Sequence, residues 1–156
     1  MVFGTKSPLK DANHYFKNMF LKLQEKEFYP YVIGDSCCMP DIFLADQLVA
    51  EELRAVSAKT IEECDLLIVN GVITNKMIPY IKESYEKLVP PKYVIAFGSC
   101  TVSGQPFDTI KLADVIPVSV YVGGCSPGAI PLKAAIDKLK EINKKNNQIV
   151  RTSEAN

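Results

Sequence analysis

The chain is patterned as short apolar runs separated by longer stretches in which apolar residues recur at helical spacing. From about residue 29 onward the two kinds of segment alternate, as they do in βαβ units around a mostly parallel sheet. Each short run is followed directly by a glycine, which marks a turn. The predicted strands are 29–33 (YPYVI), 66–70 (LLIVN), 93–97 (YVIAF) and 118–122 (VSVYV). The sequence therefore predicts an α/β domain.

Three helices are predicted between and after these strands. The first covers about 41–56, where apolar and charged positions fall on different faces. The second runs from 74 or 75 to 88, with Pro79 near its first turn and a double proline stopping it. The third begins with the cap-like Ser126, and its apolar stripe extends to about 139. We expect a flavodoxin-like parallel sheet with strand order about 2-1-3-4, flanked by these helices.

The chain is long enough for one domain and too short for two, since domains usually span about 100 to 200 residues. We assign the α/β domain to residues 29–142. Residues 1–28 form a predicted amphipathic segment that is expected to make an interface, and residues 143–156 form a polar tail. The apolar cluster of the first segment consists of Tyr15, Phe16, Met19, Phe20 and Leu23.

The charge balance argues against nucleic acid as a partner, because 18 basic and 18 acidic side chains leave no net field. No apolar run approaches the roughly 18 residues that span a bilayer, and the N-terminus lacks the pattern of an export signal. We therefore expect a soluble chain in which five cysteines serve metal or redox chemistry rather than disulfides. The one histidine, His14, is expected at the surface.

Four of the five cysteines follow predicted strands. The four edge cysteines, as we call them, are Cys37, Cys38, Cys100 and Cys125. They come after the first, third and fourth strands, and the carboxyl ends of parallel strands lie at one edge of a sheet. Their sulfurs are expected to converge there, beside glycines that let the backbone approach a bound group. Cys64 precedes the second strand, at the opposite edge, and is expected to be structural.

Four converging thiolates are typical ligands of a 4Fe-4S cluster and of a structural zinc ion. Zinc sites usually contain a Cys-x2-4-Cys knuckle, which this sequence lacks, and adjacent cysteines are awkward around a single ion. The neighbours Cys37 and Cys38 suit a cubane cluster better, because its iron corners lie apart. A zinc-stabilised binding module and a flavodoxin-like thiol switch stay open as alternatives.

The segments that carry and connect the cysteines form a recognisable series. They are CCMPD at 37–41, DLLIVNGVITNKMIP at 65–79, PPKYVIAFGSCTVSGQPFDT at 90–109 and VIPVSVYVGGCSP at 115–127. In this order and spacing they resemble the family of the 20 kDa iron-sulfur subunit of complex I, also called the PSST subunit. They are also similar to the related small subunits of membrane-bound nickel-iron hydrogenases. The resemblance covers most of residues 29–142.

The resemblance implies one 4Fe-4S cluster on the four edge cysteines of a flavodoxin-like fold. It implies an electron-transfer subunit of a complex-I-like oxidoreductase, working between NADH or another donor and quinone, with no catalysis by the chain alone. The implied partners are a larger catalytic subunit of the quinone-site or nickel-site type, a ferredoxin-like multi-cluster donor subunit, and membrane subunits. The chain would then lie peripherally on the cytoplasmic side of the membrane. The small subunit of a membrane-bound hydrogenase or of a ferredoxin-dependent reductase is the alternative.

Asp41 stands three residues after the second cysteine, where that family commonly has a glutamate. The resemblance therefore implies a carboxylate near the cluster, so that proton uptake would accompany electron uptake. A carboxylate in the first turn of a helix is also favoured by about 0.3 to 1 kcal/mol through the helix dipole. A role in capping the helix is thus equally open. The arginine-rich stretch of quinone-reducing members is replaced by AVSAKTIEECD, which leaves the electron acceptor open.

Overall fold

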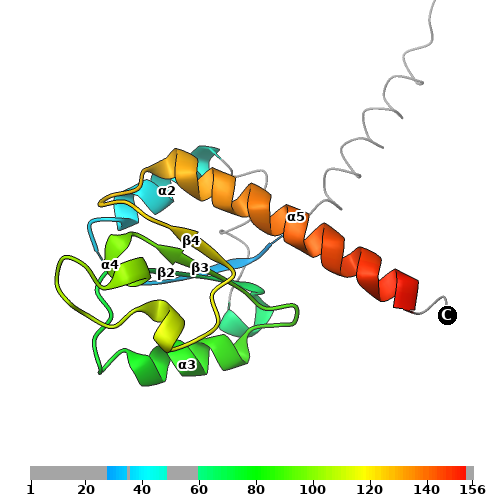
Figure 1. The fold of residues 1–156 in the computed structure, drawn as a ribbon, viewed down its shortest axis with the longest axis horizontal. Coiled ribbons are helices and arrows are strands. Elements are labelled where there is room, and N and C mark those ends of the chain that lie inside the picture. The colour runs from blue at the N-terminus through cyan, green and yellow to red at the C-terminus, as the bar shows by residue number, and fades with distance from the viewer. Residues whose placement is uncertain (1–27, 35, 49–59, 154–156) are drawn as a thin grey trace, which may run out of the picture.

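The computed structural model describes residues 28–34, 36–48 and 60–153. These residues form a four-stranded parallel sheet with helices on both faces (Figure 1). The predicted α/β fold class is therefore confirmed. The predicted segment 1–28 and its aromatic cluster, with His14, fall almost wholly outside the described residues.

The strands are β1 (Pro30–Ile33), β2 (Leu66–Asn70), β3 (Tyr93–Phe97) and β4 (Val120–Val122). The bounds of β2 and β3 match the prediction, and β1 begins one residue later than predicted. Strand β4 begins two residues later, because the hydroxyl of Ser119 accepts the hydrogen bond of the Val94 N–H (3.1 Å). A side chain thus takes the place of a backbone partner at that point.

The predicted strand order 2-1-3-4 is wrong, because the observed order is β1-β2-β3-β4. Strand β2 pairs with β1 on one side and with β3 on the other, and all five of its residues are buried. Strand β1 is at the edge of the sheet, and its two middle residues are only half-buried. The run of β2 is apolar except for Asn70 at its end, which suits a strand that is covered on both faces and paired on both sides, so β2 rather than β1 lies inside.

Two helices cover one face of the sheet, and one helix with an irregular connection covers the other (Figure 1). Helices α2 (Met39–Leu48) and α5 (Ala129–Ser153) pack together on the first face. Helix α3 (Ile78–Lys87) and the 3-10 turn η2 (Leu112–Asp114) cover the second face. Short elements flank the central strands at their two ends: η1 (Ile61–Glu63) before β2 and α4 (Ser99–Ser103) after β3.

Alternate residues of the central strands build two separate cores. Ile68 of β2 and Ile95 of β3 point to the α2 and α5 side, where Ile136 of α5 is fully buried. Leu67 and Val94 point to the other side. Each fully buried aliphatic side chain of this kind contributes about 1.5 to 3 kcal/mol to folding. The sheet is therefore held from both faces, which fixes the loops at its edge.

Helix α5 is longer than the sequence predicted. It runs from Ala129 to Ser153, so that it passes the predicted end near residue 139 and enters the polar tail. That stretch contains no glycine or proline, and its lysines, with Glu141, Gln148 and Arg151, are residues that favour a helix. In Figure 1 the end of α5 projects beyond the sheet. No helix in the described ranges is long and apolar enough to cross a membrane.

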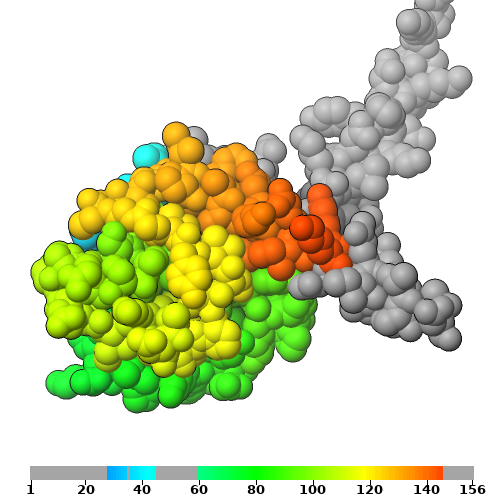
Figure 2. Space-filling view, viewed as in Figure 1, coloured from blue at the N-terminus to red at the C-terminus, as the bar shows by residue number. Residues whose placement is uncertain are grey.

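Residues 98–119 join β3 to β4 and contain two short regular elements. They hold α4 and η2, and Leu112 of η2 is fully buried. In the space-filling view this connection lies over the visible face, beside α5 (Figure 2). The segment is thus a packed part of the domain, with α4 placed at the end of β3.

Candidate functional site

All four strands end at one edge of the sheet, and the loops that leave this edge carry the candidate site. The parallel register pairs Ile33 with Val69, Asn70 with Phe97, and Phe97 with Val122, so the strand ends are nearly level. The loops after β1, β3 and β4 contain the four edge cysteines. The common edge predicted for these residues is therefore confirmed.

The loop after β1 passes over the end of β2 at two glycines. A Cβ atom added at Gly34 would lie 2.1 Å from the carbonyl oxygen of Asn70, and one added at Gly71 would lie 2.7 Å from the Cβ of Ser36. Both glycines also have φ values that disfavour side chains, +117° and +84°. Because no side chain stands in the way, the tandem cysteines reach across β2 toward β3.

Cys38 lies against the end of β3. Its side chain is 4% exposed, and a Cβ atom added at Gly98 would lie 2.9 Å from its sulfur. Gly98 has φ +98° and directly precedes α4, in which Cys100 is 8% exposed. A glycine at this position therefore leaves the space that the sulfur of Cys38 occupies beside Cys100.

Cys37 and Cys100 both lie within electrostatic reach of the Cys38 thiol. The pKa of the Cys38 thiol is raised to about 11, mainly by burial and next by the charge of Cys37. The nearby Ser36 hydroxyl lowers this pKa, while a hydrogen bond with Cys37 and the charge of Cys100 raise it. The thiol of Cys38 is thus protonated at neutral pH, as expected where like charges and burial oppose the thiolate.

The three loops that carry the cysteines have no basic residue in their sequence that would stabilise thiolates. The loops GDSCCMPD, GSCTVSG and GGCSPG contain neither lysine nor arginine. Reactive cysteines of enzymes and redox sensors usually have lowered pKa values, caused by nearby cations or helix N-termini. The raised pKa of Cys38 is the opposite of that pattern. Binding of iron or zinc is a different case, because the metal itself displaces the proton.

Cys125 is at the same edge but is exposed, on the loop between β4 and α5. That loop is joined to α4 by Gly124, whose carbonyl accepts a hydrogen bond from the Ser99 N–H (2.9 Å). The Gly124 N–H in turn donates to Ser99 Oγ (3.2 Å). The structure therefore brings Cys37, Cys38 and Cys100 together and holds the loop of Cys125 beside them.

Asp41 joins α2 to the same loop. Its Oδ2 atom accepts a hydrogen bond from the N–H of Gly128 (2.9 Å), three residues after Cys125. The carboxylate lies in the first turn of α2, where the helix dipole favours it. Asp41 thus has a structural partner that was not predicted, and it connects the segment of the tandem cysteines with that of Cys125.

Cys64 lies where the sequence placed it, two residues before the first residue of β2 and therefore at the opposite edge of the sheet. It is fully buried in the core on the α3 side, and its thiol donates to the carbonyl of Thr60 (3.5 Å). Burial, followed by the charges of Asp65 and its acidic neighbours, raises the pKa of this thiol. Its surroundings are those of a core residue.

A single metal ion needs three or more donors that converge on one point. Among residues 28–34, 36–48 and 60–153, no group of histidine, cysteine, aspartate or glutamate is arranged in that way. The ligands of a cubane cluster need a wider arrangement, since each sulfur binds a different iron atom. The convergence of all four sulfurs on one group stays a prediction.

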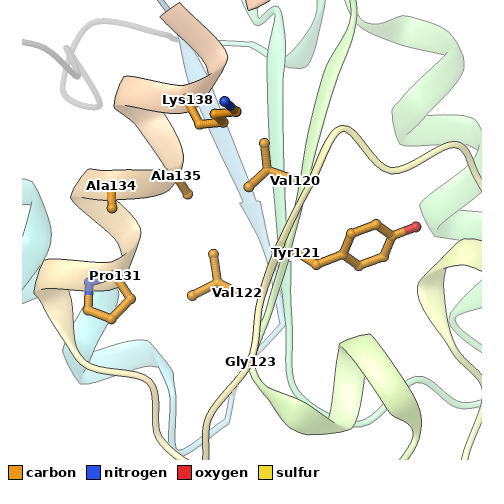
Figure 3. Close-up of a pocket in the computed structure, with 8 residues that line it drawn as sticks. All are labelled: Val120, Tyr121, Val122, Gly123, Pro131, Ala134, Ala135 and Lys138. Atoms are coloured by element: carbon orange, nitrogen blue, oxygen red, sulfur yellow. The ribbon is translucent and has the colours of Figure 1, made fainter. Parts of the chain in front are cut away.

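The hollow between β4 and α5 lies apart from the cysteines. It has a volume of about 330 Å3, and Figure 3 shows Val120, Val122, Pro131 and Ala135 directed into it while the ring of Tyr121 points away. Its one ionisable group directed inward is Lys138 at one end. A mostly apolar groove of this kind offers no metal ligands.

Sequence reasoning missed the polar residues that hold the edge together. Asn70 and Thr101 are both fully buried, and the hydroxyl of Thr101 donates to the carbonyl of Gly71 (2.8 Å). Asn70 makes hydrogen bonds to the last residue of β1 and to the loop that follows it. One signal was present in the sequence: an asparagine and a glycine end the otherwise apolar run LLIVNG.

Alkylation of the chain without bound metal should separate the thiols by exposure and pKa. At pH 8 we expect iodoacetamide to modify the exposed Cys37 and Cys125 first, and Cys38 at least about tenfold more slowly. Only about one Cys38 thiol in a thousand is ionised three units below its pKa of about 11. The rate at Cys38 should therefore rise as the pH is raised toward 11. Tandem mass spectrometry would measure each rate, and equal rates at Cys37 and Cys38 would contradict the account.

A family model and two relatives of known name all point to subunits of NADH or NAD(P)H quinone oxidoreductases. The family model described as NADH ubiquinone oxidoreductase, 20 kDa subunit, matches residues 32–139. A subunit of the NADH-quinone oxidoreductase of Clostridium beijerinckii is 34% identical over 151 residues, which cover 87% of this chain and 85% of the relative. A subunit of the NAD(P)H-quinone oxidoreductase of Acaryochloris marina is 36% identical over 121 residues, 72% of this chain. The match spans 58% of the length of that second relative.

A solved structure has the same fold. One chain of the membrane-bound sulfane sulfur reductase, an archaeal respiratory membrane complex, superposes with a TM-score of 0.62 at 28% sequence identity. The match covers 81% of this chain and 76% of the other. The similarity thus extends over nearly all of the described α/β domain.

Proposed function

Because the chain belongs to the family of the 20 kDa subunit of NADH ubiquinone oxidoreductase, we propose that it is an electron-transfer subunit with one 4Fe-4S cluster on the four edge cysteines. The family resemblance read from the sequence is thereby confirmed, and the cluster and its ligands are the proposal. When bound, such a cluster takes up and releases one electron at a time. The chain's own residues would hold it and set its surroundings.

The observation that carries the proposal is the position of Cys38 between the ends of β1 and β3. Its sulfur lies in the space left by Gly98, within electrostatic reach of Cys37 and Cys100. Glycines at 34 and 71 let this loop cross β2, where any side chain would collide with the neighbouring segment. The edge therefore uses three glycines to bring thiols from distant parts of the chain together.

The donor set fits a cluster better than the two alternatives. Thiolates are the usual ligands of 4Fe-4S clusters, and four of them leave the strand ends here. A thiol switch would need an activated thiol, whereas the pKa of Cys38 is raised. A structural zinc ion would need all four sulfurs about 2.3 Å from one ion, and adjacent cysteines oppose that geometry.

We propose that partner subunits cover the edge. Cys37 and Cys125 are exposed, and so are Phe43 on α2 and Ile130 on α5, with exposed fractions of 65% and 76%. Exposed thiols and large apolar side chains on the same two helices and their loops are typical of an interface. The proposed partners are a larger catalytic subunit, a ferredoxin-like multi-cluster donor subunit and membrane subunits. The chain would be peripheral, on the cytoplasmic side.

Quinone is the proposed acceptor, because the named relatives are quinone oxidoreductase subunits. The solved structure with the same fold belongs to a complex named as a sulfane sulfur reductase. An enzyme assay therefore has to distinguish quinone from sulfane sulfur as the electron acceptor. The purified complex should reduce a soluble quinone analogue faster than polysulfide, and it should not evolve hydrogen from reduced viologen. Hydrogen evolution would instead favour the hydrogenase-type alternative.

The cluster itself is tested by chemical analysis. The anaerobically purified complex should contain about four irons and four acid-labile sulfides attributable to this chain, and its visible absorption should bleach on reduction with dithionite. Zinc without sulfide would instead support the zinc-stabilised module. If the chain contains neither iron nor zinc, the thiol switch is the alternative that remains, and the proposal is contradicted.

We propose that Asp41 couples proton uptake to reduction of the cluster. The variant Asp41→Asn keeps an oxygen that can accept the hydrogen bond from Gly128, so the loop should stay in place. Removal of one negative charge about 5 to 8 Å from the cluster should favour reduction by about 2 to 3 kcal/mol at an effective dielectric constant of 20. Redox titration followed by low-temperature EPR at several pH values would measure this. The potential should fall as pH rises in the wild type and become flat in the variant, and identical slopes would leave Asp41 only its structural role.

A further inference from the structure

Asn70 is a polar side chain with no exposure, at the centre of the edge that carries the cysteines. Its Nδ2 atom donates to the carbonyl of Ile33 (3.1 Å) and toward that of Gly34 (3.4 Å). Its Oδ1 atom accepts from the hydroxyl of Ser36 (2.6 Å). One residue of β2 therefore binds the last residue of β1 and two residues of the loop that follows it and carries the tandem cysteines.

Ser36 connects Asn70 to Cys38. Its Oγ atom accepts a hydrogen bond from the N–H of Cys38 (3.3 Å), and its hydroxyl is close enough to the Cys38 thiol to lower the pKa of that group. A serine hydroxyl has one proton to donate. Asn70 and the sulfur of Cys38 thus compete for that proton, and the 2.6 Å contact gives it to Asn70.

Ser36 has little freedom to move away from this contact. An added Cβ at Gly71 would lie 2.7 Å from the Cβ of Ser36, so the two backbones are already close. The hollow beside it, about 370 Å3 in volume, is lined by Gly34, Ser36, Asn70, Gly71, Val72 and Met77. Rotation of the hydroxyl, rather than movement of the loop, therefore decides which acceptor is used.

We propose that Asn70 is a positioning residue that keeps the proton of Ser36 away from the sulfur of Cys38 and so holds the cluster at a lower reduction potential. The proposal rests on the proposed function. Hydrogen bonds to ligand sulfurs are one of the factors that set the potential of iron-sulfur clusters, since they stabilise the more negative reduced form. Without the Asn70 acceptor, the hydroxyl of Ser36 turns to the sulfur and the potential rises.

The test compares Asn70→Leu, Ser36→Ala and the double variant in the anaerobically purified complex. Leucine matches asparagine in size, so it removes the acceptor without making room for water. Iron and sulfide are counted in each variant, and the potential is measured by redox titration with low-temperature EPR. Ser84→Ala is the control, because Ser84 is a buried hydroxyl residue in the middle of α3, away from the edge.

Asn70→Leu should favour reduction by about tenfold, which for one electron is about 59 mV. Ser36→Ala, the double variant and Ser84→Ala should stay within about twofold of the wild type. A shift in Asn70→Leu that persists in the double variant, or no shift with the cluster fully loaded, would overturn the role of Asn70 and leave the cluster proposal standing.

Other outcomes are also decisive. If the wild-type complex contains no iron and sulfide on this chain, the proposed function itself fails. If the Asn70→Leu variant does not bind the cluster, the reduction potential of Ser36→Ala is the deciding measurement. A potential equal to that of the wild type supports the proposal. A tenfold loss of reducibility in Ser36→Ala overturns it, because Ser36 would then already donate to the sulfur in the presence of Asn70.

Discussion

Replacement of Cys38 by alanine is expected to remove the cluster, lowering the iron bound by this chain from about four atoms to less than one. Of the four edge cysteines, Cys38 is the most enclosed, at 4% exposure, and its sulfur lies in the space left by Gly98. No other side chain can replace a ligand at that point, because Ser36 and Asn70 already bind each other. Iron and sulfide analysis of the purified complex measures the loss.

Cys64→Ala is the matched control for this experiment. Cys64 is as deeply buried as Cys38, but it lies at the opposite edge of the sheet. Its loss should cost about 1 kcal/mol of folding stability for the small cavity and leave the iron content unchanged. If Cys64→Ala loses iron while Cys38→Ala retains it, the ligand set proposed for this chain is wrong.

Gly34→Ala should have the largest effect on folding, a loss of about 3 kcal/mol or more in the free energy of unfolding. The new Cβ would lie 2.1 Å from the backbone carbonyl oxygen of Asn70, and the residue would have to keep a φ near +117°. Neither the carbonyl nor the strand that carries it can move, because β2 is paired on both sides. Urea unfolding followed by circular dichroism measures the change.

Gly123→Ala provides the comparison in the same kind of loop. A Cβ added at Gly123 meets nothing within 4 Å, and the residue is exposed. Its effect should stay within about 0.5 kcal/mol of the wild type. Equal stability of Gly34→Ala and Gly123→Ala would show that the loop after β1 does not cross β2 in the way described.

The strands that the sequence predicted best are those whose surroundings are uniform. Residues 66–70 and 93–97 are apolar at nearly every position, and the structure buries all ten of them in β2 and β3. The start of β4 was less predictable, because Ser119 uses its side chain in place of the backbone. Whether a side chain replaces a backbone partner in this way depends on the neighbouring strand, and the periodicity of apolar residues along the chain does not reveal it.

The strand order was not predictable from local patterns. It depends on which strands pair, and pairing is decided by contacts between residues far apart in the chain, such as Pro30 with Leu66. The apolar run at 66–70 did contain a signal, since a strand covered on both faces and paired on both sides needs no polar position except at its end. That signal favours a central position for β2 and an edge position for β1.

For the candidate site, the sequence predicted the edge and the thiols but missed the way in which they are held. Position after a strand was enough to place the cysteines at one edge, because parallel strands all end there. The crossing of the β1 loop over β2 could not be predicted from the sequence. Gly71 and Asn70 contact this loop only because β2 lies between β1 and β3. A wrong strand order thus concealed the residues that support the tandem cysteines.

An anaerobic cryo-electron microscopy structure of the complex that contains this chain tests the central claim most directly. We expect one cubane-shaped density at the carboxyl edge of the sheet, with the sulfurs of Cys37, Cys38, Cys100 and Cys125 each bonded to a different iron atom. Cys64 should remain in the core on the α3 side. A single tetrahedral ion at this edge, or a cluster from which any of the four edge cysteines stands apart, would contradict the claim.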